Sequence, residues 1–403
     1  MKIHGAFKRI LTSRPGRAIR RFVERRRIYN FTESCHGPAT RRALVSYLVR
    51  PLLAPPAFRD RVMFSNRGIA QEIVHALNAL GYAVDIVNFD NSSWVPSLPY
   101  DLFVGHGGHQ FLSHSRTTRG PKLYFSTGSY WRIANSREAD RLHQLTARTG
   151  HLLPPDRVVS EDEEAANRAA DAIICLGNQA AASTYATFPR VAHINNAVYS
   201  LPYSVIKSHA TSRNSFLFFA GRGNVHKGLD LLLESFHRLD ATLHVCQHLE
   251  ADFLSAYQPL LATMNNVHMH GFVEMRSKHF REVAQACSWV ILPTCSEGQP
   301  GSVLECMSHG LIPVLPDTAH IDLGDFGIRI ADCSVEGIGS AVADCLSLSQ
   351  EECTRRTSSI AQTIAVDYSP ATFRSSFAAA VRSCLSALDV AHSPLAPHGE
   401  DSH

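Results

Sequence analysis

The sequence predicts an α/β protein with two doubly wound, Rossmann-like domains, each a parallel sheet covered by helices. At 403 residues the chain exceeds one typical hydrophobic core, and its 45% hydrophobic content is ordinary for a globular protein. Short apolar runs alternate with helix-period segments in two stretches, residues 41–200 and 214–368. Residues 201–213 between them show neither period and carry turn-forming residues, so we interpret them as an interdomain linker.

In the first stretch, apolar runs predict buried strands at residues 43–49, 83–87, 101–104, 122–126, 171–176 and 191–195. A helix that follows Ser65 to Gly68 carries its apolar residues on one face and ends at Gly81. Two further helices are predicted at residues 161–170 and 178–188. This alternation is typical of a parallel sheet with crossover helices.

The second stretch repeats the rhythm, with strands predicted at residues 216–220, 243–246, 267–270, 289–293 and 311–315. Helices are predicted at residues 229–239, 279–286 and 302–309, the last with Gly310 as its C′ residue. Ser369 and Pro370 are a typical start for a final helix, residues 369–390, with one apolar stripe. The tail, residues 391–403, is rich in polar residues and proline, and we expect it to be disordered.

Two glutamates flank one predicted strand-to-helix loop of the second stretch. Glu297 lies in the loop after Pro293, and Glu305 lies one turn into the following helix. In open parallel sheets, ligands bind at the carboxyl ends of the strands. We expect Val303, Leu304 and Met307 to face the sheet, which directs Glu305 toward the mouth of a cleft. The free N–H groups at the helix start attract a phosphate or a sugar oxygen.

The loop and helix carry the string P-T-x-x-E-G-x-P-x-x-x-x-E-x-M-x-x-G-x-x-P-V, beginning at Pro293. This string resembles the donor-site signature of the retaining GT-B glycosyltransferases of family 4. Two glutamates eight residues apart are common on surfaces, whereas the whole string in this context is specific. The resemblance implies a GT-B fold, in which two Rossmann-like domains face each other across a cleft and the C-terminal helix crosses back. It implies that Glu305 binds the ribose of the nucleotide. It also implies that the donor sugar is bound by Glu297 and the residues after it, Gly298, Gln299, Pro300, Gly301 and Ser302.

A second motif, Gly221-Arg222 followed by Lys227-Gly228, lies at a predicted strand-to-helix turn. Two cations beside glycines suit a diphosphate, although surface arginines and lysines are most often only solvated. The spacing is similar to the G-R-x-x-x-x-K-G of the same family. The resemblance implies that Arg222 and Lys227 hold the pyrophosphate of the donor and offset the charge on the leaving nucleoside diphosphate.

The first stretch holds less specific chemistry. His106 and His109 lie where a strand ends, and His114 follows. The first two either face the cleft and take part in catalysis, or only cap and pack. A metal site is disfavoured because no acidic or cysteine partner accompanies them. The histidine that the family carries after the next strand is absent here. On the acceptor side we expect polar contacts from Asn66, Arg67, Arg132 and Arg137.

The resemblance, which covers about residues 43–385, implies a glycosyltransferase of the hexosyltransferase kind that needs neither metal nor cofactor. It would transfer sugar from a nucleotide-sugar, with retention, to a glycan, glycolipid or small molecule, for example in polysaccharide biosynthesis. Two alternatives stay open. One is another GT-B enzyme, such as an epimerase or a phosphorylase. The other is a non-catalytic subunit that binds a nucleotide-sugar or a protein partner.

Charge and cysteine content bear on location. Residues 1–40 form a basic arm, in which residues 1–27 carry a net charge of +9, so that the rest carries about −6 and does not resemble a nucleic-acid binder. The arm is either solvated or a peripheral contact with an anionic membrane. Deleting residues 1–27 should then lower membrane recovery at low salt without changing turnover. Ten scattered cysteines, no membrane-spanning run and no signal peptide indicate a cytoplasmic protein.

Overall fold

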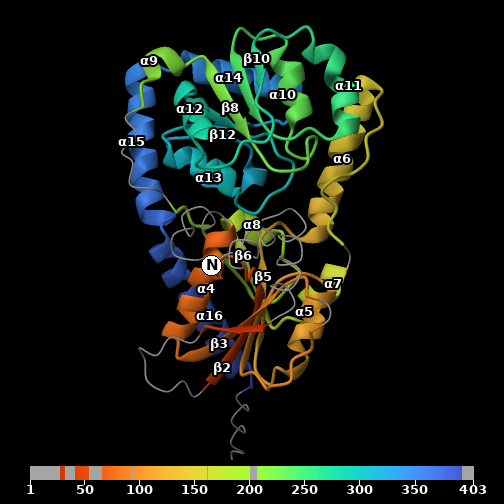
Figure 1. Ribbon diagram of the computed structural model, residues 1–403, viewed down its shortest axis with the longest axis vertical. Helices are drawn as coiled ribbons and strands as arrows, with labels where there is room; N and C mark the ends of the chain where they lie inside the picture. The colour runs from red at the N-terminus through yellow and green to blue at the C-terminus, as the bar shows by residue number, and fades with distance from the viewer. Residues whose placement is uncertain are drawn as a thin grey trace, which may run out of the picture.

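The computed structural model describes residues 28–31, 41–53, 66–91, 94–160, 162–199 and 207–392. Residues 1–27, which carry the basic charge, residues 201–206 of the predicted linker and the tail from residue 393 lie outside these ranges. The described residues form two α/β units stacked along the long axis of the molecule, the first at the bottom of Figure 1 and the second at the top.

The first unit contains a seven-stranded sheet in the order β1-β3-β2-β4-β5-β6-β7. Its strands are β1 (Ile28–Asn30), β2 (Arg41–Tyr47), β3 (Tyr82–Asn88), β4 (Leu102–Gly105), β5 (Lys122–Ser126), β6 (Ala172–Leu176) and β7 (Val191–Ile194). Strand β1 pairs antiparallel with β3, and the other pairs are parallel. The predicted strands are confirmed within about two residues, while β1 was not predicted because three residues carry no periodicity.

The helices of the first unit are α4 (Asn66–Ala79), α5 (His109–His114), α6 (Trp131–Thr149), α7 (Asp162–Ala169) and α8 (Gln179–Ser183), with a 3-10 turn η2 (Ser115–Thr117). The helix predicted over residues 178–188 is wrong in length. The Asn178 side chain caps the start of α8, but the helix ends at Ser183 and the chain continues as turns. Helix α6 was not predicted, because its buried stripe is partly polar: Ala134, Glu138, Arg141 and Leu145.

The second unit contains a parallel six-stranded sheet in the order β10-β9-β8-β11-β12-β13. Its strands are β8 (Ser215–Phe219), β9 (Thr242–Cys246), β10 (Val267–Met269), β11 (Trp289–Ile291), β12 (Ile312–Leu315) and β13 (Ile328–Arg329). The strand order reverses direction between β8 and β11. Ligands of doubly wound sheets bind at such a switch point, beyond the carboxyl ends of the strands.

The helices of the second unit are α9 (His209–Ser212), α10 (Leu229–Phe236), α11 (Ala251–Leu261), α12 (Lys278–Ala286), α13 (Gly301–Ser308), α14 (Val335–Ser347) and α15 (Gln350–Asp367), with a 3-10 turn η3 (Asp317–Ala319). Helix α13 starts within a residue of its predicted position, and Gly310 follows it with φ +80°, a left-handed conformation that favours glycine. Part of the predicted linker packs on this unit, since the buried His209 ring contacts the side chains of Ser288 and Thr357.

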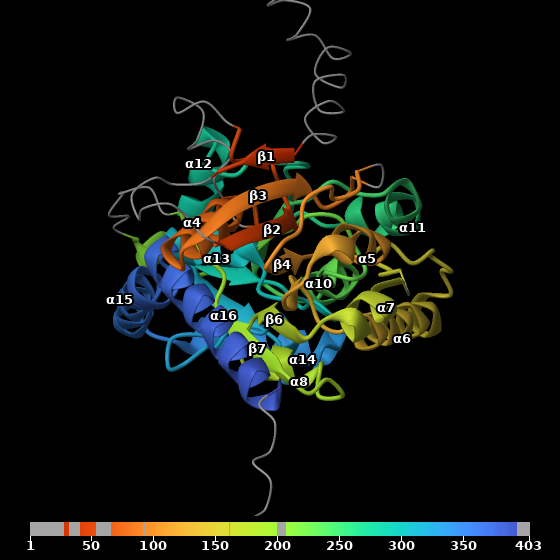
Figure 2. The same cartoon turned by 90° about the horizontal axis from the view of Figure 1, so that it is seen from below.

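The last helix, α16 (Pro370–His392), crosses back to the first unit, as predicted. The Ser369 hydroxyl accepts a hydrogen bond from the N–H of Thr372 at 3.0 Å and caps the helix. Phe373, Phe377 and Val381 are buried in the core of the first unit. Figure 2 shows α16 running past β6 and β7 on the underside of the molecule.

In the described ranges, no helix is both long and apolar enough to cross a membrane. All nine cysteines described there are free thiols, and eight of them are buried. Cys175, Cys287 and Cys306 are fully buried.

Candidate active site

The loops that follow the central strands of the two sheets meet at the interface of the units. Ser129, after β5, donates a hydrogen bond to the carbonyl of Glu297, after β11, at 2.9 Å. The Gln299 carboxamide accepts from the N–H of Asn196 at 2.7 Å and donates to the Asn195 side chain at 2.8 Å. The loop predicted to bind the donor sugar follows β11 of the second sheet and is therefore held by the loops that follow β5 and β7 of the first sheet.

Gly298 lies in close contact with the loop that follows β5. A Cβ atom built on Gly298 would lie 2.3 Å from the carbonyl oxygen of Thr127, a distance that real Cβ atoms essentially never show. Since the obstacle is backbone rather than a flexible side chain, only glycine fits here while the two loops are in contact.

The predicted residues Lys227 and Glu297 form an ion pair, although they lie 70 positions apart in the chain. Thr294 donates a further hydrogen bond to the same carboxylate oxygen at 3.0 Å. Both charged side chains are only 10% exposed. Burial alone would raise the pKa of Glu297, but the charges of Lys227 and His226 outweigh burial and lower that pKa below its ordinary value. Glu297 is therefore ionised at neutral pH.

His226 and Glu138 form a second buried contact beside this pair. The Nδ1 atom of His226 lies 2.8 Å from the carboxylate of Glu138, and its Nε2 atom lies 2.6 Å from the carbonyl of Ser296. Burial alone would lower the pKa of His226, but Cys295 and Glu138 raise it to about 9. The imidazolium thus contacts both α6, through Glu138, and the loop that carries Glu297, through Ser296. Sequence reasoning missed both residues, since nothing in a linear pattern pairs positions 138 and 226.

Arg222, the other predicted diphosphate ligand, has a different environment. Its side chain is 79% exposed, and its recorded partner is Asp156 at 3.4 Å. It lines a cavity of about 270 Å³ together with Asn224 and His226. Asp156 is positioned by its N–H, which donates to Glu138 at 2.7 Å. Arg222 is thus an exposed cation, and the carboxylate of Asp156 is its partner.

Glu305 lies on α13 and is 3% exposed. Its carboxylate pairs with the Nε atom of Arg276 at 2.8 Å, and the same guanidinium donates to the carbonyl of Tyr199. Val303, Leu304 and Met307 are buried beneath it, as predicted. Glu305 is not open to solvent as expected, because Arg276 covers the carboxylate, and its binding of the ribose stays a prediction. Arg276 has a φ of +66°, which is uncommon outside glycine.

The remaining predicted donor contacts lie at the start of α13. Pro300 is the N-cap residue and supplies no side-chain acceptor to the first turn, which contains Gly301 and Ser302. Uncapped N–H groups at a helix N-terminus favour an anionic or hydroxyl oxygen.

The predicted histidines lie in the first unit. His106 follows β4, its ring packs against Tyr47 and Phe89, and its Nδ1 atom lies 2.9 Å from the carbonyl of Phe125. Burial lowers the pKa of His106, so the ring is neutral. His109 is exposed at the start of α5. His114 is buried between Ser46 and the carbonyl of Asn91. Contact of His106 or His109 with a substrate stays a prediction.

The predicted acceptor-side residues do not form one cluster. Arg132 stacks on Trp131 and lies 3.6 Å from Glu164. Arg67 is exposed on the first turn of α4, which Asn66 begins. Arg137 lines a large cavity beside α6. Their contacts with an acceptor stay predictions. Within the described part of the chain, no group of three or more histidine, cysteine or acidic side chains could hold a metal ion.

Comparison with known proteins bears mainly on the second unit. Residues 214–347 match the family model described as "Glycosyl transferases group 1". No curated protein matches the chain in sequence.

Several solved structures share the fold at low sequence identity. Sucrose-phosphate synthase from Thermosynechococcus elongatus superposes with a TM-score of 0.58 at 12% identity, over 87% of this chain and 99% of that chain. Anabaena HepE in complex with UDP and glucose gives 0.53 at 14% identity, over 85% and 99%. A variant of S. aureus TarM in complex with fondaparinux, alpha-GlcNAc-glycerol and UDP gives 0.51 at 12% identity, over 69% and 55%. The chain thus spans about half of TarM, and these likenesses establish the GT-B fold.

Proposed function

We propose that the protein is a glycosyltransferase that moves a sugar from a nucleotide-sugar to an acceptor with retention of anomeric configuration. The observation that carries the proposal is the buried pair of Lys227 and Glu297. It lies beyond the carboxyl ends of β8 and β11, at the switch point of the sheet. The family-model match over residues 214–347 supports the same reading.

The charges around this pair fit a nucleotide-sugar. Arg222 and Lys227 would hold the diphosphate, Glu305 the ribose hydroxyls, and Glu297 a hydroxyl of the sugar. In the structure these groups form three ion pairs: Arg222 with Asp156, Lys227 with Glu297, and Glu305 with Arg276. A bound diphosphate would replace the carboxylates as the partner of both cations. We propose UDP as the nucleotide, because the solved structures of HepE and TarM contain UDP.

The proposed chemistry needs positive charge beside the leaving diphosphate and a site from which water is excluded. As the bond between the sugar C1 and the diphosphate oxygen breaks, Lys227 and Arg222 would stabilise the negative charge that develops. The acceptor oxygen forms the new bond to C1 on the same face, and its proton leaves with the diphosphate. Because these two side chains supply the charge, we propose that no metal is required. The contact of Gly298 with Thr127 would help to exclude water.

Donor turnover tests the proposal. We would measure UDP release from a panel of UDP-sugars, with the anomer of the product assigned by NMR. Lys227→Met should lower kcat by about 100- to 1,000-fold, as for loss of one transition-state charge contact. Arg355→Gln, which breaks an exposed pair with Asp325 outside the site, is the matched control and should be silent.

Two results would overturn the proposal. Equal UDP release by the native protein and Lys227→Met would remove the pair from catalysis. Binding of a nucleotide-sugar without any turnover, across UDP-, GDP- and ADP-sugars and a range of acceptors, would instead favour a non-catalytic binding subunit.

A further inference from the structure

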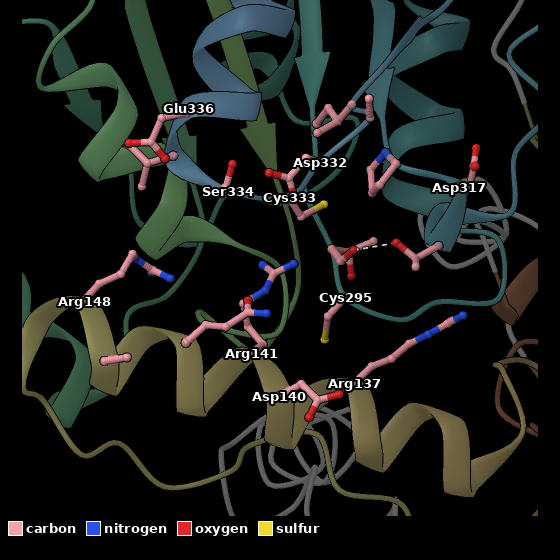
Figure 3. Close-up of a pocket in the computed structure, with 18 residues that line it drawn as sticks. Arg137, Asp140, Arg141, Arg148, Cys295, Asp317, Asp332, Cys333, Ser334 and Glu336 are labelled. Atoms are coloured by element: carbon pink, nitrogen blue, oxygen red, sulfur yellow. Dashed lines mark hydrogen bonds between the residues drawn. The ribbon is translucent and has the colours of Figure 1, made fainter.

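A cavity of about 640 Å³ lies between α6 of the first unit and the second unit (Figure 3). One wall is α6, and the other is formed by the residues that follow β11, β12 and β13, up to the start of α14. Its volume lies within the range of small-molecule sites, about 300–1,000 Å³. Lys227, Glu297 and Glu305 do not line it, so it is separate from the proposed donor site.

Two arginines of α6 provide positive charge in this cavity. In Figure 3, Arg137 and Arg141 extend from α6 toward the second unit, on either side of Cys295. Arg141 is 4% exposed and donates one hydrogen bond to the carbonyl of Pro293 at 3.0 Å. The Nη1 atom of Arg137 is buried and has no hydrogen-bond partner in the described structure. Burial also lowers the pKa of Arg137, which reflects a poorly solvated charge.

Neither arginine has a carboxylate partner within ion-pair distance in the described ranges. Arg148, about two turns after Arg141 on α6, provides the contrast: it lies 2.7 Å from Asp230 and 3.0 Å from Glu234. Arg141 still has an anion near it, since its charge counteracts the effect of burial on the pKa of the buried Asp230. Arg137 has no recorded acidic partner in the described ranges, and a buried guanidinium atom without a partner is unfavourable, so a negative group is missing at Arg137.

The other residues that line the cavity indicate which kind of ligand would supply the negative group. Four acidic residues line the cavity, but Asp317 pairs with Arg329 at 2.9 Å and Glu336 lies 3.7 Å from Arg238. The other two, Asp140 and Asp332, are available to accept hydrogen bonds from hydroxyl groups, as is the Ser334 side chain to donate one. Cations at one end and hydroxyl-binding groups around them suit a carbohydrate that bears an oxyanion.

We propose that this cavity binds a small anionic carbohydrate, a sugar phosphate or a uronic acid, with its oxyanion on Arg137 and Arg141. Thr294 lines the cavity and donates to the carboxylate of Glu297 at 3.0 Å, so the bound molecule lies beside the loop of the proposed donor site. This position suits either an acceptor substrate or an effector. The binding itself does not rest on the proposed glycosyltransferase activity.

Binding is tested on the full-length protein with four probes at equal ionic strength: glucose 6-phosphate, glucuronate, inorganic phosphate and glucose. Calorimetry should show binding of glucose 6-phosphate or glucuronate, weaker binding of phosphate, and none of glucose. Arg137→Gln should weaken that binding at least tenfold. Arg116→Gln, an exposed arginine of η2 far from the cavity lining, is the control and should leave it unchanged.

A second readout locates the ligand and guards against a variant that misfolds. Cys295 lines the cavity and is buried, so the bound probe should slow its alkylation by iodoacetamide at least severalfold, measured by peptide mass spectrometry. UDP binding retained by Arg137→Gln would show that the variant is folded. No binding of either anionic sugar, or equal binding and equal Cys295 protection in the native protein and Arg137→Gln, would overturn the proposal.

A turnover assay then distinguishes the two possible roles of the ligand, acceptor substrate and effector. Sugar transfer from a UDP-sugar onto the bound probe would identify an acceptor. A changed rate of UDP release, with the probe recovered unmodified, would identify an effector. Both results support the site. Loss of the response in Arg137→Gln would show that the ligand acts from this cavity.

Discussion

At the scale of single residues, Lys227 and Glu297 show how one contact can serve both stability and function. Each is a charge held in a mostly buried position, which is unfavourable unless the partner is present. Thr294 adds a hydrogen bond to the carboxylate. The two charges therefore neutralise each other in the structure. A bound donor would offer a new partner to each of them.

Removing one partner should be more harmful than removing both. Lys227→Met leaves a buried carboxylate and should lower the free energy of unfolding by about 3–5 kcal/mol. The double variant Lys227→Met with Glu297→Gln should recover most of that loss, because no uncompensated charge remains, yet it should stay inactive. Urea denaturation of both single variants and the double variant measures the coupling. Strictly additive losses would contradict a direct interaction.

Sequence patterns could predict some of these residues but not their partners. Arg222, Lys227 and Glu297 directly follow predicted strands, so their place at the carboxyl edge of a sheet follows from local patterns. Arg276 and Tyr199, which cover Glu305, could not be predicted, since their contacts join segments 29 and 77 positions apart.

At the scale of elements, α6 is the part of the fold that sequence periodicity failed to predict. Figure 1 shows it extending from the first unit along the side of the second. Leu145 of α6 is buried in the core of the second unit, and the other contacts of α6 there are polar, through Glu138 with His226, Arg141 with Pro293, and Arg148 with Asp230. A helix that docks through charged groups lacks the apolar stripe by which amphipathic helices are predicted.

The docking of α6 should depend on pH through His226. The pKa of His226 is raised to about 9 in the folded protein, from an ordinary value of 6.5. Its contribution to stability is thus full below pH 6.5 and is lost as the pH rises through 9. The free energy of unfolding should fall over this window by an amount on the order of 3 kcal/mol. Denaturation at several pH values measures the slope.

Glu138→Gln, which removes the carboxylate beside His226, is the matched variant for this pH effect. It should reduce the loss of stability between pH 6.5 and 9. A slope identical to that of the native protein would show that the contact between Glu138 and His226 does not hold His226 in its charged form.

The loop contact at Gly298 should tolerate no side chain. Gly298→Ala places a Cβ atom against the Thr127 carbonyl, so the loops must separate. We expect a loss of about 1–3 kcal/mol in the free energy of unfolding, typical of overpacking, and a raised KM for the donor. Gly128→Ala in the facing loop is the control, since its Cβ atom would meet nothing within 4 Å. Equal effects of the two substitutions would argue against the close contact.

At the scale of the whole molecule, the alternation of strands and helices was enough to predict both sheets, whereas the crossover of α16 was implied by the resemblance to GT-B glycosyltransferases. Short edge strands such as β1 and β13 escaped prediction because two or three residues carry no period. The interface between the units could not be predicted, since it is built from polar contacts between distant segments. This interface also creates the large cavity beside α6.

The decisive measurement is the thermal unfolding midpoint with UDP, GDP and ADP, for the native protein and Glu305→Gln. A nucleotide present at about 100 times its Kd should stabilise the native protein by about 2.7 kcal/mol, which raises the midpoint measurably. We expect such a shift with UDP, a much smaller one in Glu305→Gln, and an undiminished one in Arg137→Gln. No shift with any nucleotide, or equal shifts in the native protein and Glu305→Gln, would contradict a nucleotide-sugar site between the two units.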